Sequence, residues 1–392
     1  MARNILISLN QAIKLVQKEK KNFIRKEAIK LEKSMGRVSS KIITSPIDLP
    51  TYDSAGLDGY VIVNKNKTTL KISKKIITPG KLYKNLDTNL AYRINTGSII
   101  PDKFSHFISL ENAFIEKNFI DISSSKISNK DIKKKSEDLK KGKIILKKNQ
   151  IINFRNISLL ASVGIKSLNV YKLLKIGVVS NGNELVSFNK SKKDFQTFDS
   201  NKLQIINFLN QYNVHVQDLG ILKDDISKVE SFYKNKIKNF DVIVSSGGSS
   251  FSSGDLISSF LEKKSKMIFK YIRMQPGRPI IFSKYKSKYI FSLPGNPLAV
   301  FINLFFVIKP FLENHKRTIN ENIELVRSGF NDEKKINLTK FYRVKIKDRK
   351  AFTHNSKGSA KLISISESDG LLILNDNQKK VVKGKKYNFV KF

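Results

Sequence analysis

Between residues 172 and 309, segments with the hydrophobic pattern of buried strands alternate with segments that have the pattern of helices. The strand segments are 173–180, VHVQDLG, 241–246 and KYIFSL. The helix segments begin near Ser200, Ser227, Asp255 and Pro297. Such alternation predicts a mainly parallel, doubly wound α/β sheet, because each parallel connection needs a crossover, usually a helix.

The flanking regions have other patterns. The first fifty residues contain two helix candidates, one capped by Ser8 and one over 26–35, and a further helix over 156–165 is expected to end at Gly164. Short strand candidates occupy the region between, and the pattern beyond about 317 is that of a small all-β domain. We therefore expect a multidomain α/β protein with three parts. These are a helical and linker region at 1–172 with a β-rich domain inserted at about 50–150, an α/β domain at 173–316, and a C-terminal β domain at 317–392.

Composition excludes several classes of protein. The chain has no cysteine, so disulfides, thiolate zinc sites and iron–sulfur clusters are excluded. The net charge is +40, but only 11 of the 73 basic residues are arginine, which favours a solvated lysine surface over a nucleic-acid site. Lysines interrupt the N-terminus where a signal peptide needs an apolar core, and the apolar stretch at 298–308 is too short for a bilayer. We expect a cytoplasmic protein that binds neither membrane nor nucleic acid.

Three glycine-containing loops follow strand candidates, at 180–184, 245–255 and 293–297. In an open α/β sheet, ligands bind at the carboxyl ends of the strands. Glycines let the backbone approach a ligand, and a following helix N-terminus favours anions. The serine-rich loop 245–255 therefore predicts a cradle for phosphate or another oxyanion, whereas each loop taken alone could be a simple turn.

Carboxylates accompany these loops at Glu184, Asp224, Asp225 and Asp255. Mg²⁺ prefers oxygen ligands and also holds substrate phosphates, so acids beside an anion cradle predict a magnesium site. Helix capping is the alternative for Asp225 and Asp255. The four histidines are scattered without metal-ligand spacing, and we assign them no role.

Two loops of the β-rich region, 49–60 and 93–101, would count as turns on physical grounds alone. The whole series of motifs, however, resembles the bacterial molybdopterin molybdenumtransferase family, which inserts molybdate into adenylylated molybdopterin. The motifs occur in the family's order as LPTYDSAGLDGY, INTGSIIP, KSEDLKKG, LLASVGI, SNGNELV, FDSN, LGILKDD, SSGGSS, QPGRP and LPGNP. The resemblance extends nearly end to end. The chain departs from the family pattern at Ala55, Ser105, Asn181, Ser252 and Gln275, but keeps every candidate acid.

The resemblance implies a molybdopterin-binding α/β domain and a set of functional residues. The functional acids and threonine matched by similarity are Asp58, Thr96, Asp138, Glu184, Asp224 and Asp255. The acids Glu184, Asp224 and Asp255 are expected to hold or orient Mg²⁺. The expected substrate-binding residues are Ser246, Gly247, Gly248, Ser249, Ser250, Arg278, Pro294, Gly295, Asn296 and Pro297.

The implied reaction is Mg²⁺-dependent cleavage of the adenylyl–molybdopterin pyrophosphate, which releases AMP while molybdate passes to the pterin dithiolene. The implied assembly is a homodimer, with an active site between the α/β domain of one subunit and the β-rich domain of the other. The resemblance also implies docking with the molybdopterin adenylyltransferase. Two alternatives remain open. One is a non-inserting homologue that binds or adenylylates molybdopterin, and the other is a basic nucleic-acid-binding protein.

Overall fold

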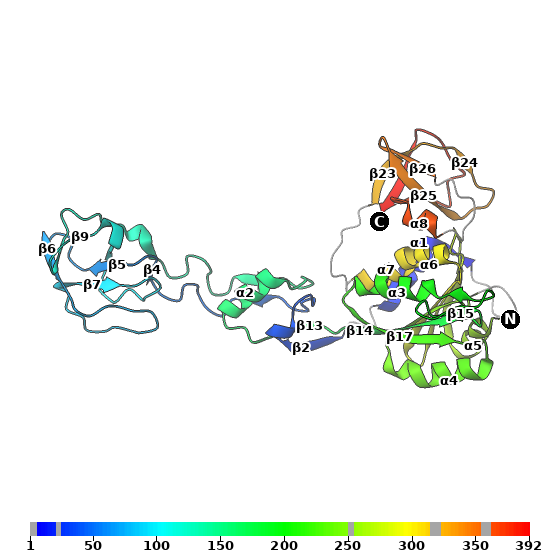
Figure 1. The fold of residues 1–392 in the computed structure, drawn as a ribbon, viewed down its shortest axis with the longest axis horizontal. Helices are drawn as coiled ribbons and strands as arrows, with labels where there is room; N and C mark the ends of the chain where they lie inside the picture. Colours follow the sequence, from blue (N-terminus) through cyan, green and yellow to red (C-terminus); the bar gives the residue numbers. More distant parts are fainter. Residues whose placement is uncertain (1–5, 21–24, 250–254, 314–322, 354–361) are drawn as a thin grey trace. The chain divides into compact units, whose positions relative to one another are not determined.

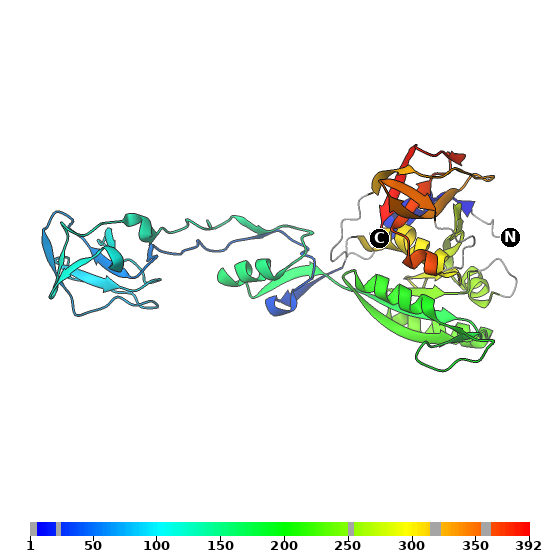
Figure 2. The same cartoon turned by 45° about the horizontal axis from the view of Figure 1, so that its top comes forward.

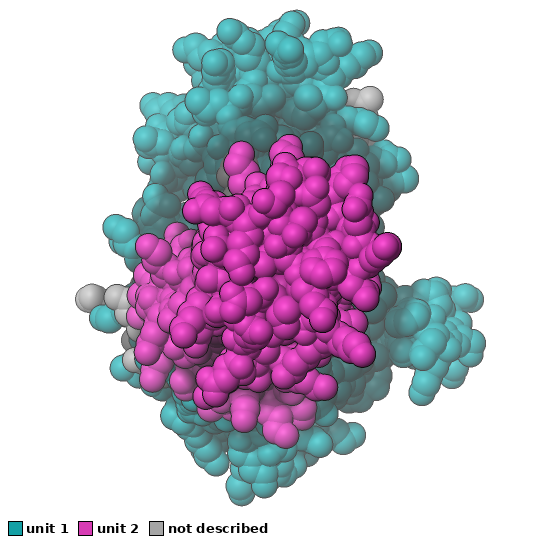
Figure 3. All heavy atoms as spheres, turned by 90° about the vertical axis from the view of Figure 1, so that its left-hand side faces the viewer, with its two compact units in different colours: residues 1–27, 36–38, 171–392 teal, residues 28–35, 39–170 magenta. Residues whose placement is uncertain are grey.

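The computed structural model describes residues 6–20, 25–249, 255–313, 323–353 and 362–392. The chain forms two compact units, which Figure 3 shows in different colours. Unit 1 consists of residues 1–27, 36–38 and 171–392, and unit 2 of residues 28–35 and 39–170. No helix among the described residues is long and apolar enough to cross a membrane.

Unit 1 contains a seven-stranded sheet that confirms the expected α/β fold. In spatial order its strands are β1 (Leu6–Ile7), β19 (Lys266–Ile272), β21 (Pro279–Tyr285), β22 (Lys288–Leu293), β18 (Val242–Ser246), β14 (Leu174–Asn181) and β17 (Val214–Leu222). All neighbours are parallel except at β21, which is antiparallel to both β19 and β22. The hairpin β21–β22 turns at Lys286 and Ser287, both with positive φ.

Helices cover both faces of this sheet (Figures 1 and 2). One face carries α1 (Leu9–Lys20), α3 (Ser200–Asn210), α6 (Pro297–Asn303), the π-helical turn η6 (Leu304–Ile308) and α7 (Lys309–Leu312). The other carries α4 (Ile226–Lys236) and α5 (Leu256–Lys264). Successive residues of β18 alternate between the two cores, since Val242 and Val244 belong to the first and Ile243 to the second.

The C-terminal part of unit 1 is a small barrel. Its strands follow the order β20 (Met274–Gln275), β25 (Thr339–Lys347), β26 (Lys350–Thr353), β23 (Ile323–Ser328), β29 (Lys386–Lys391) and β27 (Gly370–Leu374). Because β27 also pairs with β25, the sheet closes on itself. A two-stranded ladder, β24 (Asp332–Glu333) with β28 (Lys380–Val381), and the short helix α8 (Ile363–Ser366) complete it. The barrel packs on the α/β domain through Phe341, whose ring centroid lies 4.5 Å from that of Phe306.

Unit 2 is built around a six-stranded sheet. The order is β8 (His106–Ser109), β5 (Gly59–Ile62), β7 (Leu90–Ile94), β6 (Thr69–Ile72), β10 (Phe119–Asp121) and β9 (Phe114–Glu116). Two separate two-stranded ladders belong to the same unit, β4 (Ser54–Ala55) with β11 (Ile132–Lys133) and β3 (Ile43–Thr44) with β12 (Ile144–Leu146). The expected helix over 156–165 is α2 (Phe154–Ser162), and Gly164 after it has a φ of +76°.

The helix expected over 26–35 is wrong. These residues form β2 (Lys26–Lys30) and a single 3-10 turn (Leu31–Lys33), and β2 pairs with β13 (Ser167–Tyr171). Residues 26–30 read Lys-Glu-Ala-Ile-Lys, and their exposure alternates along the strand. The helix-forming character of Lys, Glu and Ala therefore gives way to pairing with a partner strand far along the chain.

Candidate functional site

The loops after β14, β18 and β22 lie at one edge of the unit 1 sheet, because these strands are adjacent and parallel. Ser180 aligns with Ser246, and Ser246 aligns with Leu293. The N–H of Gly247 donates to the carbonyl oxygen of Leu293 over 3.0 Å, which joins two of the loops directly. The expected convergence of the three loops is confirmed.

Two glycines allow the loop after β18 to pack closely. Gly247 and Gly248 have φ values of +81° and +87°. A Cβ at Gly247 would lie 2.5 Å from the carbonyl oxygen of Asn181, and one at Gly248 would lie 2.7 Å from the Cβ of Ile257. Both positions therefore exclude larger residues on conformational and steric grounds. Ser246 and Ser249 beside them are buried, and Ser250 lies outside the described residues.

Asn201, in the first turn of α3, connects these loops and was not among the predicted site residues. Its Nδ2 donates to Ser246 Oγ over 2.9 Å and to the carbonyl oxygen of Gly295 over 2.8 Å. A carbonyl oxygen only accepts hydrogen bonds, so the Gly295 contact fixes which end of the Asn201 amide faces the loops. The available sequence signal was its position in the FDSN motif, at the start of a predicted helix whose cap is Asp199.

The acids near the end of β14 form a second small network. Asp224 Oδ1 accepts from Asn181 Nδ2 over 2.7 Å, and Asp224 Oδ2 accepts from the N–H of Asn183 over 3.1 Å. The Glu184 carboxylate folds over Gly182, where a Cβ would lie 2.6 Å from Oε2. No hydrogen bond or ion pair to the Glu184 carboxylate is found within the part of the chain that the structure describes. Among the acids at this edge of the sheet, Glu184 is therefore the one whose carboxylate is open to a cation.

Asp255 is the N-cap of α5. Its Oδ1 accepts from the N–H of Ser258 over 3.0 Å, and the residue is 8% exposed. Asp225 likewise caps α4 through the N–H groups of Ser227 and Lys228. Across the described ranges, no three acidic or histidine side chains are grouped closely enough to enclose a metal ion by themselves. The capping alternative is thus realised at both aspartates.

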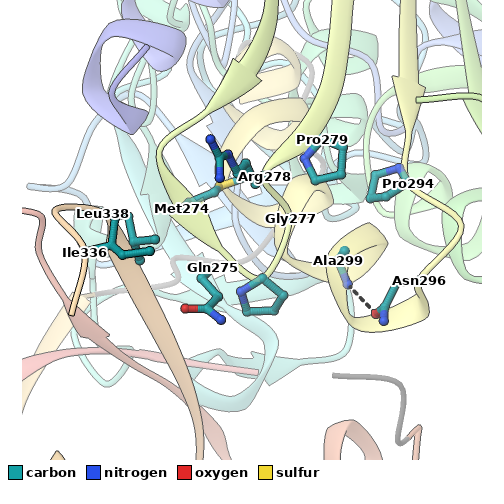
Figure 4. A pocket seen from close by; sticks show the side chains of 11 residues that line it. Met274, Gln275, Gly277, Arg278, Pro279, Pro294, Asn296, Ala299, Ile336 and Leu338 are labelled. Atoms are coloured by element: carbon teal, nitrogen blue, oxygen red, sulfur yellow. Dashed lines mark hydrogen bonds between the residues drawn. The ribbon is translucent and has the colours of Figure 1, made fainter. Parts of the chain in front are cut away.

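The QPGRP and LPGNP motifs border one cavity of about 380 Å³, shown in Figure 4. Arg278, Pro294 and Asn296 line it from the α/β domain, and Ile336 and Leu338 line it from the C-terminal barrel. Asn296 also caps α6, in which Pro297 occupies the first turn, by accepting from the N–H groups of Leu298 and Ala299. The predicted substrate-binding residues around 278 and 294–297 are therefore adjacent in space.

In unit 2, Asp58 and Thr96 form a hydrogen-bonded pair. Asp58 Oδ1 accepts from the backbone N–H of Thr96 over 2.6 Å and from its Oγ1 over 2.7 Å. These two bonds, with a smaller contribution from the charge of Arg93, hold the pKa of Asp58 below its ordinary value. The carboxylate is therefore ionised at neutral pH. The residue is also exposed to solvent.

Asp138 is not part of that pair. It precedes Leu139, which forms an isolated bridge with Leu49, and its own N–H donates to the carbonyl oxygen of Leu49. No side-chain hydrogen bond of Asp138 is found among the described residues. Asp138 therefore lies in an exposed bend of unit 2.

Three family models match successive parts of the chain. They are described as the MoeA N-terminal region (domain I and II) over residues 7–164, a probable molybdopterin binding domain over 177–314, and the MoeA C-terminal region (domain IV) over 326–392. A molybdopterin molybdenumtransferase of Haemophilus influenzae is 28% identical over 73% of this chain and 72% of its own length. One from a Nostoc species is 24% identical over 73% and 68%.

Solved structures show the same architecture. A molybdopterin biosynthesis MoeA protein from Pyrococcus horikoshii superposes with a TM-score of 0.82 at 26% identity, covering 98% of this chain and 99% of that one. A second structure from this organism, with a TM-score of 0.69 at 21% identity, covers 99% and 100% and supports the fold alone. The likeness extends over both units and the C-terminal barrel.

Proposed function

The chain belongs to the MoeA family, and from this premise we propose that it is a molybdopterin molybdotransferase, which inserts molybdate into adenylylated molybdopterin and releases AMP. The main structural support for the proposal is that three strand-end loops converge around Asn201 at the carboxyl edge of the unit 1 sheet. This is the edge at which open α/β sheets bind ligands.

The described side chains suit a substrate that combines phosphates with a hydrogen-bonding heterocycle. Arg278 contributes positive charge to the cavity beside the loops, as anionic phosphates require. Among the described residues, the Oδ1 atoms of Asn181 and Asn201 are buried without a hydrogen-bond donor. Buried acceptors are normally satisfied, so N–H groups of a bound heterocycle or ordered water would complete them.

Mg²⁺ is proposed as the cation of the reaction, and the donor set is compatible with it. Mg²⁺ usually takes one or two protein carboxylates together with substrate phosphates and water. Glu184 would be the direct carboxylate ligand, while Asp224 orients Asn181 and Asn183 next to it. Asp255 would act through the α5 N-terminus that it caps. When bound, the ion would neutralise charge that develops on the cleaved pyrophosphate.

We further propose a cytoplasmic homodimer in which Asp58, Thr96 and Asp138 of one copy serve the reaction together with the strand-end loops. Docking with the molybdopterin adenylyltransferase would deliver the substrate. Both proposals are supported by the family resemblance. The exposed and ionised Asp58 is consistent with a residue that meets a ligand only after assembly.

The test is to incubate the purified chain with adenylylated molybdopterin and to measure AMP release with and without molybdate and Mg²⁺. The proposal expects release that needs both ions. Tight substrate binding with no molybdate-dependent release would contradict it and would favour the non-inserting homologue.

A further inference from the structure

A cavity of about 330 Å³ opens on unit 2 and has no part in the function proposed above. It is bordered by β5, β6, β7 and the turn between β9 and β10. Four cationic side chains line it, and no carboxylate does; they are Lys71, Lys74, Arg93 and Lys117. Its volume falls within the range of about 300 to 1,000 Å³ that is typical of small-ligand sites.

The backbone around this cavity is held by main-chain hydrogen bonds. The N–H of Ile72 donates to the carbonyl oxygen of Asn118 over 2.8 Å, which ties the β9–β10 turn to the end of β6. The N–H of Ser73 donates to the carbonyl oxygen of Ala91 over 2.9 Å, which ties the same segment to β7. The cationic side chains therefore project from a connected framework, not from separate loops.

The three lysines have no acidic partner in the part of the chain that the structure describes. Among the described residues, no ion pair or side-chain hydrogen bond involves Lys71, Lys74 or Lys117. Elsewhere in unit 2 a lysine does find an acid, since Lys134 Nζ lies 2.8 Å from Asp53 Oδ2. Cations that share one cavity repel one another, and a multiply charged anion between them would replace this repulsion with attraction.

We propose that this cavity binds a multivalent oxyanion, either a tetrahedral dianion such as molybdate or the phosphoryl groups of a phosphate or pyrophosphate. Arg93 supplies a planar donor fork that suits oxyanions, Ser73 and Asn118 add polar groups, and Tyr60 contributes an aromatic wall. The binding site uses residues of unit 2 alone, so it does not depend on the transfer reaction proposed for the chain.

Lysine footprinting of the full-length protein tests this site directly. Acetylation rates at single lysines are measured by mass spectrometry in sodium pyrophosphate, in sodium molybdate, and in sodium chloride of equal ionic strength. We expect at least about fivefold protection of Lys71, Lys74 and Lys117 by a multivalent anion, with little protection of exposed Lys84 and Lys126. Comparing the pyrophosphate and molybdate arms identifies the preferred oxyanion. Equal protection of all five lysines would overturn the proposal. So would acetylation rates at Lys71, Lys74 and Lys117 that are the same in chloride as in the multivalent anions.

Matched charge removal gives a second test. In the Lys71→Gln/Lys117→Gln variant, the anion concentration that half-protects Lys74 should rise at least about tenfold, and Arg93→Gln should produce the same direction of change. The Lys84→Gln/Lys126→Gln variant removes equal charge from the same unit and should shift it by less than about twofold. Equal shifts in the two double variants would show that anions are attracted diffusely by the +40 net charge of the chain, to an extent set by salt, and would exclude a site.

Discussion

The two units hold their candidate site residues in different ways. In unit 1 the polar groups at the sheet edge are largely occupied in joining loops, as Asn201 joins Ser246 to Gly295. In unit 2, among the described residues, the carboxylate of Asp58 accepts hydrogen bonds only from Thr96, and the pair is exposed. Because of this difference, we expect substitutions in unit 1 to lower stability and activity together, and substitutions at the unit 2 pair to lower activity alone.

The largest effect on stability is expected from Gly247→Ala. The new methyl group would lie 2.5 Å from a backbone oxygen, at a φ of +81° that alanine rarely adopts. We expect a loss of about 2 to 3 kcal/mol in the free energy of unfolding of unit 1. Urea unfolding followed by circular dichroism measures it. Gly295→Ala, where a Cβ meets no atom within 4 Å, is the matched control, and an equal loss there would refute the steric argument.

Asn201→Ala is expected to have the next largest effect. It removes two hydrogen bonds, each worth about 1 kcal/mol, so unit 1 should lose about 2 kcal/mol and molybdate-dependent AMP release should fall at least about tenfold. Asn207→Ala on the same helix is the control, because among the described residues the Nδ2 of Asn207 donates only to the carbonyl oxygen of Leu203, within α3. Comparable losses in both variants would show that Asn201 contributes only to the helix.

Thr96→Val should separate activity from stability. It keeps the backbone N–H bond to Asp58 but removes the Oγ1 bond, so we expect reduced AMP release and an unchanged melting temperature. Thr69→Val, at an exposed position of β6, should change neither quantity. A clear fall in the melting temperature of the Thr96 variant would contradict the distinction between the two units.

The smallest effect expected is on pH dependence. The hydrogen bonds from Thr96 favour the charged carboxylate, so the pKa of Asp58 in the folded chain lies below its unfolded value of about 3.9. Thr96→Val removes one of these bonds, so the Asp58 carboxyl resonance, followed by NMR, should titrate at a higher pH in the variant than in the wild type. A titration midpoint that stays the same or falls in the variant would show that Thr96 does not stabilise the charged carboxylate.

The α/β domain was largely predictable because its strands and helices carry strong local patterns. The β21–β22 hairpin was missed since the predicted pattern of crossovers did not anticipate an antiparallel strand within the sheet. The strand at 26–30 was assigned as a helix because its pairing with β13 depends on residues about 140 positions away. Local sequence carries no signal for such a partner.

In the candidate site, too, features with a local sequence pattern could be predicted, and contacts between distant residues could not. The three loops could be located from glycines and strand ends, because parallel neighbouring strands end at the same edge. The role of Asn201 could not, since its acceptors lie 45 and 94 residues further along the chain. The Asp58–Thr96 pair was found only through the family resemblance, because each residue alone stands in an ordinary turn.

We propose that the loops of unit 1 in one copy of the chain and the Asp58–Thr96 pair of a second copy serve one molybdate-transfer site. Mixing Asp58→Ala protein with Glu184→Ala protein tests it most directly, with AMP release measured before and after subunit exchange. Each variant alone should be folded and inactive. If two copies share each site, the equilibrated mixture should recover up to about a quarter of wild-type activity, because half the dimers are mixed and each carries one intact site. Wild-type activity in either single variant, or no recovery in a mixture shown to contain mixed dimers, would contradict the claim.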